Sequence, residues 1–159
     1  MCTCIAYENG DFYFGRNMDL DYSIGEQIIL TPRNYLLELR KLDPVARHYA
    51  MVGMAASEDK FPLYAEAVNE KGLFMAGLNF PENAVYQEAE EGWKNITPFE
   101  LIPWILASCS SVQEARKLLF QARIVELPFA REMPLAPLHW MLADGKECLV
   151  LEAVEEGVK

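Results

Sequence analysis

Strand-like segments fill the first half of the chain before any helix-like segment appears, and this order restricts the folds open to it. Alternating or β-branched apolar residues, separated by turn residues, mark five or six such segments. They cover residues 2–7, 12–14, 27–31, 49–55, 63–68 and 73–78. The first two flank Asn9-Gly10, a sequence typical of a tight hairpin turn. Strands first and helices later favour an α+β fold with an antiparallel sheet.

Two helices are predicted after these strands. Thr97-Pro98-Phe99-Glu100 has a capping residue, a proline at the first helical position and a glutamate three residues after the cap. We expect this helix to reach Cys109, with Pro103 removing one backbone hydrogen bond and bending it. Ser111 and Glu114 repeat the capping pattern before a second amphipathic helix. Further strands over residues 138–142 and 148–154, with a turn between them, are predicted to close the fold.

Length, composition and charge exclude several classes of protein. The chain of 159 residues is 52% hydrophobic and suits one domain over residues 1–159. Fourteen basic against 24 acidic residues give a formal charge of -10, which predicts no nucleic-acid and no membrane partner. No apolar run has a membrane-spanning length and no signal-peptide pattern begins the chain, so we expect a cytoplasmic protein. The four cysteines have neither disulfide-framework nor zinc-site spacing.

Cys2 is the first candidate for chemistry. Removal of Met1 would leave a thiol and a free α-amine on the same residue. An α-amine has a pKa near that needed to accept a thiol proton at neutral pH, so this residue would be a nucleophile that carries its own base. A small residue after the initiator methionine is also common in proteins that use no such chemistry, and both interpretations are open on this residue alone.

Three further residues lie at the ends of predicted strands. Hairpin pairing returns Arg16 and Asp19 to the end of the sheet where Cys2 lies, where an arginine would favour a thiolate and an aspartate could orient an amine. A solvated arginine and a turn-capping aspartate are the alternative. Asn79 ends another strand, where its amide could stabilise an oxyanion or merely hold the turn. His139 lies in an apolar strand and is expected to be a hydrogen-bonded structural residue.

Six ordered motifs together resemble the choloylglycine hydrolase family, which comprises conjugated bile salt hydrolases and penicillin V acylases. They are Met-Cys-Thr at 1–3, Phe-Gly-Arg-Asn-Met-Asp-Leu at 14–20, Pro-Arg-Asn at 32–34, Asn-Glu-Lys-Gly-Leu at 69–73, Ala-Gly-Leu-Asn-Phe-Pro at 76–81 and Leu-His-Trp-Met at 138–141. The resemblance runs along essentially the whole chain. It implies an N-terminal-nucleophile hydrolase with an αββα sandwich fold.

The resemblance also implies a reaction and a set of site residues. The family cleaves linear amides, and Cys2 matches its nucleophile. Arg16 and Asp19 match the residues that hold and polarise that nucleophile, Asn79 matches the side chain of the oxyanion hole, and Met18 matches a pocket-lining position. The implied substrate is a small amphipathic amide: a conjugated bile salt, or alternatively penicillin V or an acyl-homoserine lactone. No metal or organic cofactor is implied.

Length is the main departure from the family, whose members are roughly twice as long. A second asparagine and a second arginine of the catalytic set belong to the part that would follow this sequence. We therefore expect a truncated N-terminal half, with antiparallel strands, two helices and sheet surface left uncovered. The alternatives are a weak amidase, an inactive one, or a non-catalytic remnant that forms a homo-oligomer or associates with a complementing chain.

Overall fold

The computed structural model describes residues 2–19 and 23–159 of the chain. Its first elements are β1 (Thr3–Asn9) and β2 (Asp11–Asn17), which form an antiparallel hairpin in which Cys4 pairs with Arg16. Gly10 has a φ of 76° at the turn, a conformation that glycine adopts without steric cost. The hairpin predicted from Asn9-Gly10 is confirmed, and both of its strands extend beyond the predicted bounds.

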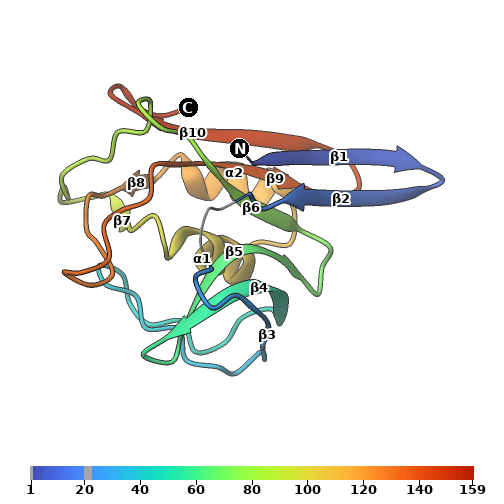
Figure 1. The fold of residues 1–159 in the computed structure, drawn as a ribbon, viewed down its shortest axis with the longest axis horizontal. Coiled ribbons are helices and arrows are strands. Elements are labelled where there is room, and N and C mark those ends of the chain that lie inside the picture. Colours follow the sequence, from blue (N-terminus) through green and yellow to red (C-terminus); the bar gives the residue numbers. More distant parts are fainter. Residues whose placement is uncertain (1, 20–22) are drawn as a thin grey trace.

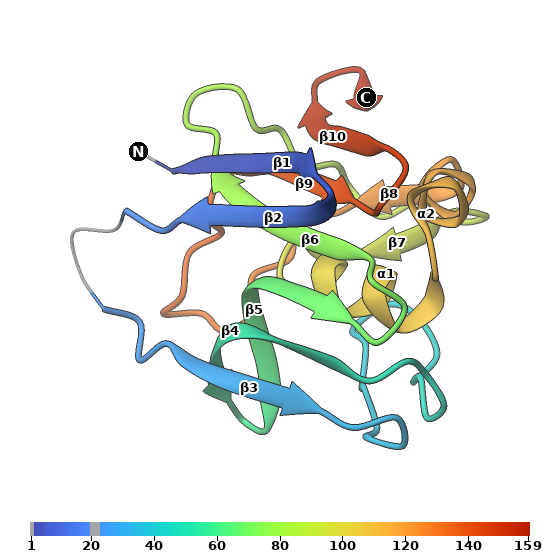
Figure 2. The same cartoon turned by 90° about the vertical axis from the view of Figure 1, so that its right-hand side faces the viewer.

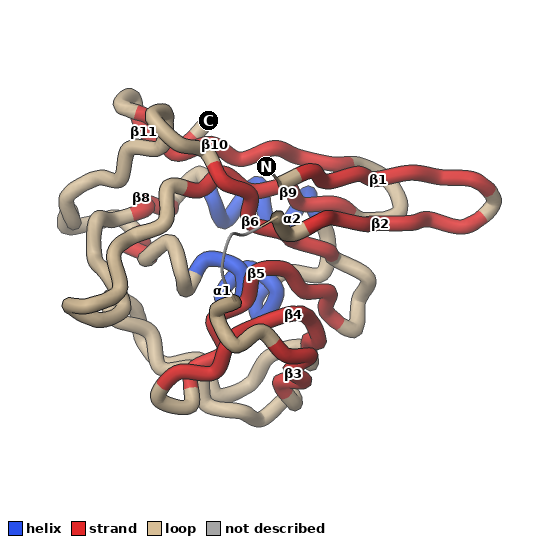
Figure 3. Tube along the Cα trace, viewed as in Figure 1, coloured by secondary structure: helices blue, strands red, loops and turns tan. Residues whose placement is uncertain are grey.

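Within the described residues, seven strands form one antiparallel sheet in the order β11-β10-β9-β6-β5-β4-β3. Their bounds are β3 (Gln27–Thr31), β4 (Met51–Glu58), β5 (Phe61–Asn69), β6 (Phe74–Asn79), β9 (Leu138–Ala143), β10 (Cys148–Val154) and β11 (Gly157–Val158). Strands β6 and β9 are neighbours although about sixty residues separate them in the chain. Figure 3 shows these strands in red, with loops in tan connecting them.

The segment between β6 and β9 holds both helices of the described chain, α1 (Leu101–Ser108) and α2 (Val112–Leu119). It also holds β7 (Lys94–Ile96) and β8 (Ala122–Ile124), a parallel pair that the sequence patterns did not predict. Figure 2 shows the β1–β2 hairpin beside β6, with α1 and α2 on the other side of the sheet. In Figure 1 the hairpin extends beyond the end of the sheet. Helices, sheet and hairpin therefore form three successive layers.

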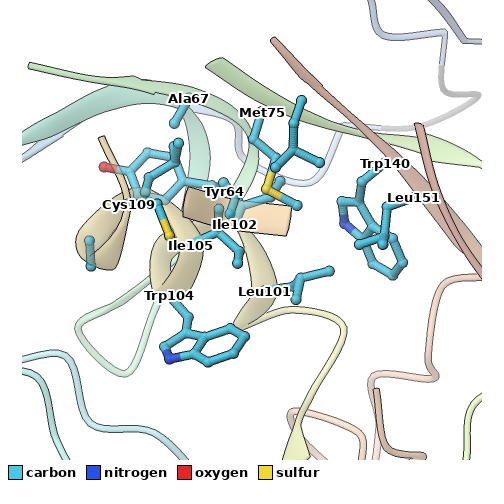
Figure 4. Packing of buried hydrophobic residues seen from close by; sticks show 14 of the residues in the cluster. Tyr64, Ala67, Met75, Leu101, Ile102, Trp104, Ile105, Cys109, Trp140 and Leu151 are labelled. Carbon is cyan, nitrogen blue, oxygen red and sulfur yellow. The ribbon is translucent and has the colours of Figure 1, made fainter. Parts of the chain in front are cut away.

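The hydrophobic core lies between the sheet and the helices. Trp140 and Met75 point from β9 and β6 toward Leu101 and Ile105 of α1, and all four side chains are buried (Figure 4). Burial of such side chains supplies most of the favourable free energy of folding. Among the described residues, no helix is long and apolar enough to cross a membrane.

Helix α1 begins later than predicted. It starts at Leu101, and Thr97 belongs to the preceding turn, where its hydroxyl donates to the Glu100 carboxylate at 2.6 Å. Pro103 therefore lies in the first turn, where backbone N–H groups have no helical acceptor, so it removes no helical hydrogen bond. The prediction that Pro103 breaks such a bond was wrong for this reason. Helix α2 begins as predicted, with the Ser111 hydroxyl accepting from the Glu114 amide.

Asn69 fixes the turn between β5 and β6 against the helix layer. Its buried side chain donates to the carbonyl oxygens of Leu106 and Cys109 at 2.8 and 2.7 Å. The side-chain oxygen of Asn69 accepts from the backbone N–H groups of Lys71 and Leu73. One side chain thus satisfies the carbonyls at the end of α1 and the amides of the turn, which positions β6 relative to the core.

Candidate functional site

The hairpin register brings Cys2 and Arg16 together. Cys2 directly precedes β1, and the next two residues pair with the end of β2, Thr3 with Asn17 and Cys4 with Arg16. The Arg16 Nη2 atom donates to the Cys2 Sγ atom at 3.7 Å. The Cys2 sulfur is therefore in contact with a positively charged side chain.

Arg16 points into the layer between the hairpin and the large sheet. Its side chain is only 4% exposed, and its Nη2 atom also donates to the carbonyl oxygen of Gly77 at 2.6 Å. Its Nε atom lies 3.1 Å from the Glu66 Oε2 atom. Glu66 on β5 pairs with Ala76 on β6, so both anchors of the guanidinium come from adjacent strands. Phe14 of β2 stacks on Phe74 of β6 at 5.2 Å and holds the two layers together.

The low polarity of this layer affects the titratable groups in it. Burial raises the pKa of the Glu66 carboxyl above its usual value, and the charge of Arg16 opposes part of that rise. Burial likewise raises the pKa of the Cys4 thiol, while hydrogen bonding to Ile5 and the charge of Arg16 lower it. Since a raised pKa leaves less thiolate at neutral pH, Cys4 is a poor candidate for the nucleophile.

Met18 and Asp19 follow β2 directly. Met18 is half-buried, and Asp19 is exposed. The pKa of the Asp19 carboxyl lies below its usual value because of a hydrogen bond and a charge interaction with the amino terminus of the chain. Met1 and Leu20, which belong to two of the quoted motifs, lie outside the described residues.

Asn79 is the last residue of β6 and is exposed there. It lies two residues after Gly77, whose carbonyl accepts from Arg16, and it pairs with Leu138 on β9. Asn79 is therefore close in the strand to the carbonyl that accepts from Arg16. Its amide group is accessible to a molecule that approaches this end of β6.

His139 differs from its prediction. Its Nδ1 atom is buried with no hydrogen-bond partner and lies 4.0 Å from the Glu152 Oε1 atom. Its ring stacks on Phe80, with centroids 4.6 Å apart. The expectation of a hydrogen-bonded structural histidine is therefore not met, because an aromatic neighbour and a more distant carboxylate replace the expected acceptor.

Glu66 is the site residue that the sequence reasoning missed. It lies in the strand predicted over residues 63–68, which is otherwise apolar apart from the Tyr64 hydroxyl. A carboxylate in such a strand is rarely buried unless it is paired. The sequence therefore indicated that Glu66 has a charged partner. That partner, Arg16, lies fifty residues away in the chain and belongs to the hairpin layer.

The family model for linear amide C–N hydrolases of the choloylglycine hydrolase family matches residues 2–159. The chain belongs to the choloylglycine hydrolase family. It is 46% identical over 159 residues to a bile salt hydrolase/transferase of Lactiplantibacillus plantarum, covering 100% of this chain and 49% of that protein. A bile salt hydrolase/transferase of Clostridium perfringens is 40% identical over 162 residues, with 98% and 49% covered.

Solved structures place the fold in the same family. A cysteine-to-alanine variant of the conjugated bile acid hydrolase from Clostridium perfringens superposes with a TM-score of 0.92 at 37% identity, covering 100% of this chain and 50% of that one. Penicillin V acylase from Agrobacterium tumefaciens has a TM-score of 0.76 at 18% identity, with 99% and 48% covered, and so shares the fold. The predicted αββα class, present here in part, is confirmed. The chain spans about half the length of the curated relatives it matches.

Proposed function

We propose that this chain carries the nucleophilic half of an amidase that hydrolyses conjugated bile salts through Cys2. The observation that carries the proposal is the contact between the Arg16 guanidinium and the Cys2 sulfur at 3.7 Å. Relatives between 33% and 46% identical are named bile salt or conjugated bile acid hydrolases, which supports this substrate class over penicillin V.

The reaction would proceed in two steps after removal of Met1. The Cys2 sulfur attacks the amide carbonyl, its α-amine takes the thiol proton and passes it to the leaving nitrogen, and glycine or taurine departs. Water then hydrolyses the thioester to release the bile acid and restore the thiol. In this proposal Arg16 and Asp19 hold the sulfur and the amine, Asn79 donates to the oxyanion, and Met18 lines the pocket.

A chimera tests the proposal. This chain is joined to the second half of the Lactiplantibacillus plantarum relative. Release of glycine from glycocholate is then compared with release of taurine from taurocholate and of the amine product from penicillin V. We expect turnover of bile salts that is abolished in Cys2→Ala and kept in the matched variant Cys4→Ala. Turnover that persists in Cys2→Ala, or a preference for penicillin V, would contradict the proposal.

The 159-residue chain alone should be slower than the chimera by roughly a thousandfold or more. Loss of one oxyanion donor costs on the order of 10²–10³ in rate, and the family resemblance assigns a further asparagine and arginine to the other half. Steady turnover by the purified monomeric chain at the rate of the chimera would show that the other half is not required. Intact mass spectrometry of the same sample reports whether Met1 has been removed.

A further inference from the structure

The Arg16 guanidinium is held at two edges besides its contact with sulfur. Its Nη2 atom donates to the Gly77 carbonyl at 2.6 Å and reaches the Cys2 sulfur at 3.7 Å. Its Nε atom forms an ion pair with the Glu66 Oε2 atom at 3.1 Å, without the geometry of a hydrogen bond. A planar guanidinium held at one nitrogen can still rotate about that contact, whereas a second anchor on another nitrogen fixes its orientation.

Burial makes the Glu66 contact costly to lose. The Arg16 side chain is 4% exposed and the Glu66 side chain 26% exposed, so few waters can replace either partner. A buried guanidinium without a counter-charge is strongly unfavourable, and the side chain would tend to move toward water. Such a movement would take the guanidinium away from the Cys2 sulfur.

The backbone of Glu66 is itself fixed by close strand packing. Gly53 on β4 lies so near β5 that a Cβ atom added to it would overlap the Glu66 carbonyl oxygen and the Cα of Ala67. The β4–β5 register shifts between Met54 and Ala55, next to this contact. The carboxylate is therefore presented from a rigid strand rather than from a loop, which is what precise positioning of another side chain requires.

We propose that Glu66 is a positioning residue that holds the Arg16 guanidinium against the Cys2 sulfur. The proposal rests on the proposed function in taking Cys2 as the nucleophile, and it adds a residue outside the predicted site. Glu66 acts through Arg16 and does not touch the sulfur itself. Its negative charge alone would disfavour a thiolate nearby, so positioning and simple electrostatics predict opposite effects when Glu66 is removed.

The test measures the rate of Cys2 alkylation by iodoacetamide at neutral pH in the 159-residue chain, with peptide mapping to separate Cys2 from the other cysteines. Glu66→Ala removes both anchor and charge. Glu66→Gln keeps the size of the side chain but removes the charge, and with it the ion pair to Arg16. The matched control is Glu152→Ala, which removes a carboxylate of β10 that lies beside His139 of β9. Arg16→Ala shows how much Cys2 alkylation changes when the guanidinium is removed completely.

We expect the rate of Cys2 alkylation to fall roughly tenfold in both Glu66→Ala and Glu66→Gln, toward the Arg16→Ala rate, because both variants lose the ion pair that holds the guanidinium. Glu152→Ala should keep the wild-type rate. Alkylation that is faster in both Glu66 variants than in wild type would overturn the proposal, because Glu66 would then act only as a charge. An unchanged rate in both Glu66 variants would overturn it as well.

A second measurement covers the case in which Glu66→Ala does not fold. Hydrogen exchange of the Arg16 guanidinium is followed by NMR in wild type and in Glu66→Gln, and we expect it to be at least about tenfold faster in Glu66→Gln, because the guanidinium loses its ion pair and moves toward water. Exchange that is equally slow in the two proteins would overturn the proposal. Failure of the proposed function would instead appear as bile-salt turnover that survives Cys2→Ala in the chimera, an outcome that does not affect the alkylation rates.

Discussion

The four cysteines of this chain lie in very different surroundings. Cys2 is half-buried beside Arg16, Cys109 is buried at the end of α1, and Cys148 is exposed at the start of β10. Burial raises the pKa of the Cys109 thiol to about 12, and the Glu114 carboxylate adds to the rise. The side chains around each sulfur therefore decide which thiols react, since all four have the same intrinsic chemistry.

Alkylation of the native chain should separate these thiols. We expect Cys2 and Cys148 to be labelled by iodoacetamide at pH 7.5, and Cys109 to stay unlabelled because almost none of it is thiolate at that pH. Peptide mapping by mass spectrometry measures this, and labelling in urea shows that Cys109 reacts once it is exposed. Labelling of native Cys109 as fast as Cys148 would contradict the prediction.

Glu70 provides a pH-dependent contribution to stability. Its carboxylate accepts from the Arg33 guanidinium and from the Ala50 amide, which lower its pKa from 4.5 to about 2. A depressed pKa contributes stability above the unfolded-state value that is lost as the pH falls toward the folded-state value. The stability difference between wild type and Glu70→Gln should therefore shrink between pH 4.5 and 2.

Urea unfolding at several pH values measures that difference. Glu58→Gln is a suitable control because Glu58 is exposed at the end of β4, away from Glu70. The wild-type advantage over Glu70→Gln should be small at high salt, since Arg33 is 70% exposed and the ion pair is open to screening. A difference that grows as the pH falls would mean that the carboxylate is not stabilised in the folded state.

At the scale of elements, the contact between β4 and β5 at Gly53 places the strictest limit on side-chain size. No side chain fits there, because the position of a Cβ atom is occupied by the backbone of β5. Gly53→Ala should lower the free energy of unfolding by about 2 kcal/mol or more, as overpacking against backbone cannot relax by a rotamer change. Gly145→Ala, where a Cβ atom meets open space, is the matched control. Equal thermal stabilities of these two variants would contradict the argument.

The starts of the two helices show that similar capping patterns in the sequence can have different outcomes. Ser111 caps α2 because its hydroxyl lies beside the Glu114 amide, a contact between residues three apart that the sequence pattern contains. The similar pattern at Thr97 does not start α1, since Thr97 and Glu100 bond to each other within a turn that precedes the helix. The Glu100 carboxylate also accepts from the Arg40 amide at 2.6 Å, a partner that no local pattern contains.

At the scale of the whole molecule, the layer that holds the hairpin covers only part of the sheet. On β3 and β4 the outer face carries apolar side chains in solvent, among them Ile28 at 72% and Leu30 at 66% exposure, and Leu30 pairs with Val52. The outer side of the hairpin is also apolar, with Ile5 and Tyr7 more than half exposed. Contiguous apolar surface of this kind is unusual for a monomeric protein.

A hydrophobic dye should bind to this surface. We expect strong fluorescence of such a dye with the 159-residue chain, and a clear decrease in the double variant Ile28→Lys with Leu30→Lys, without a large loss of thermal stability. Met133→Lys, an exposed apolar residue in the loop before β9, is the control and should leave the fluorescence unchanged. Dye binding that is identical in all three proteins would place the apolar surface elsewhere.

The sequence by itself determined the features that depend on near neighbours along the chain. The hairpin at Asn9-Gly10, the strand over Gln27–Thr31 and the Ser111 cap follow from interactions within a few residues, which leave a direct pattern. The motifs also carried the family assignment. The hairpin brought Arg16 near Cys2, because antiparallel pairing converts sequence separation into proximity.

Only the tertiary structure decided the contacts between distant segments. The parallel β7–β8 pair, the β6–β9 pairing and the ion pair between Arg16 and Glu66 join residues far apart in the chain. Such contacts depend on which layers pack together, and the free energy that selects them is the summed burial of many side chains. No short sequence pattern contains that sum. The partner of Glu66 can therefore be identified only from the packing of the hairpin on the sheet.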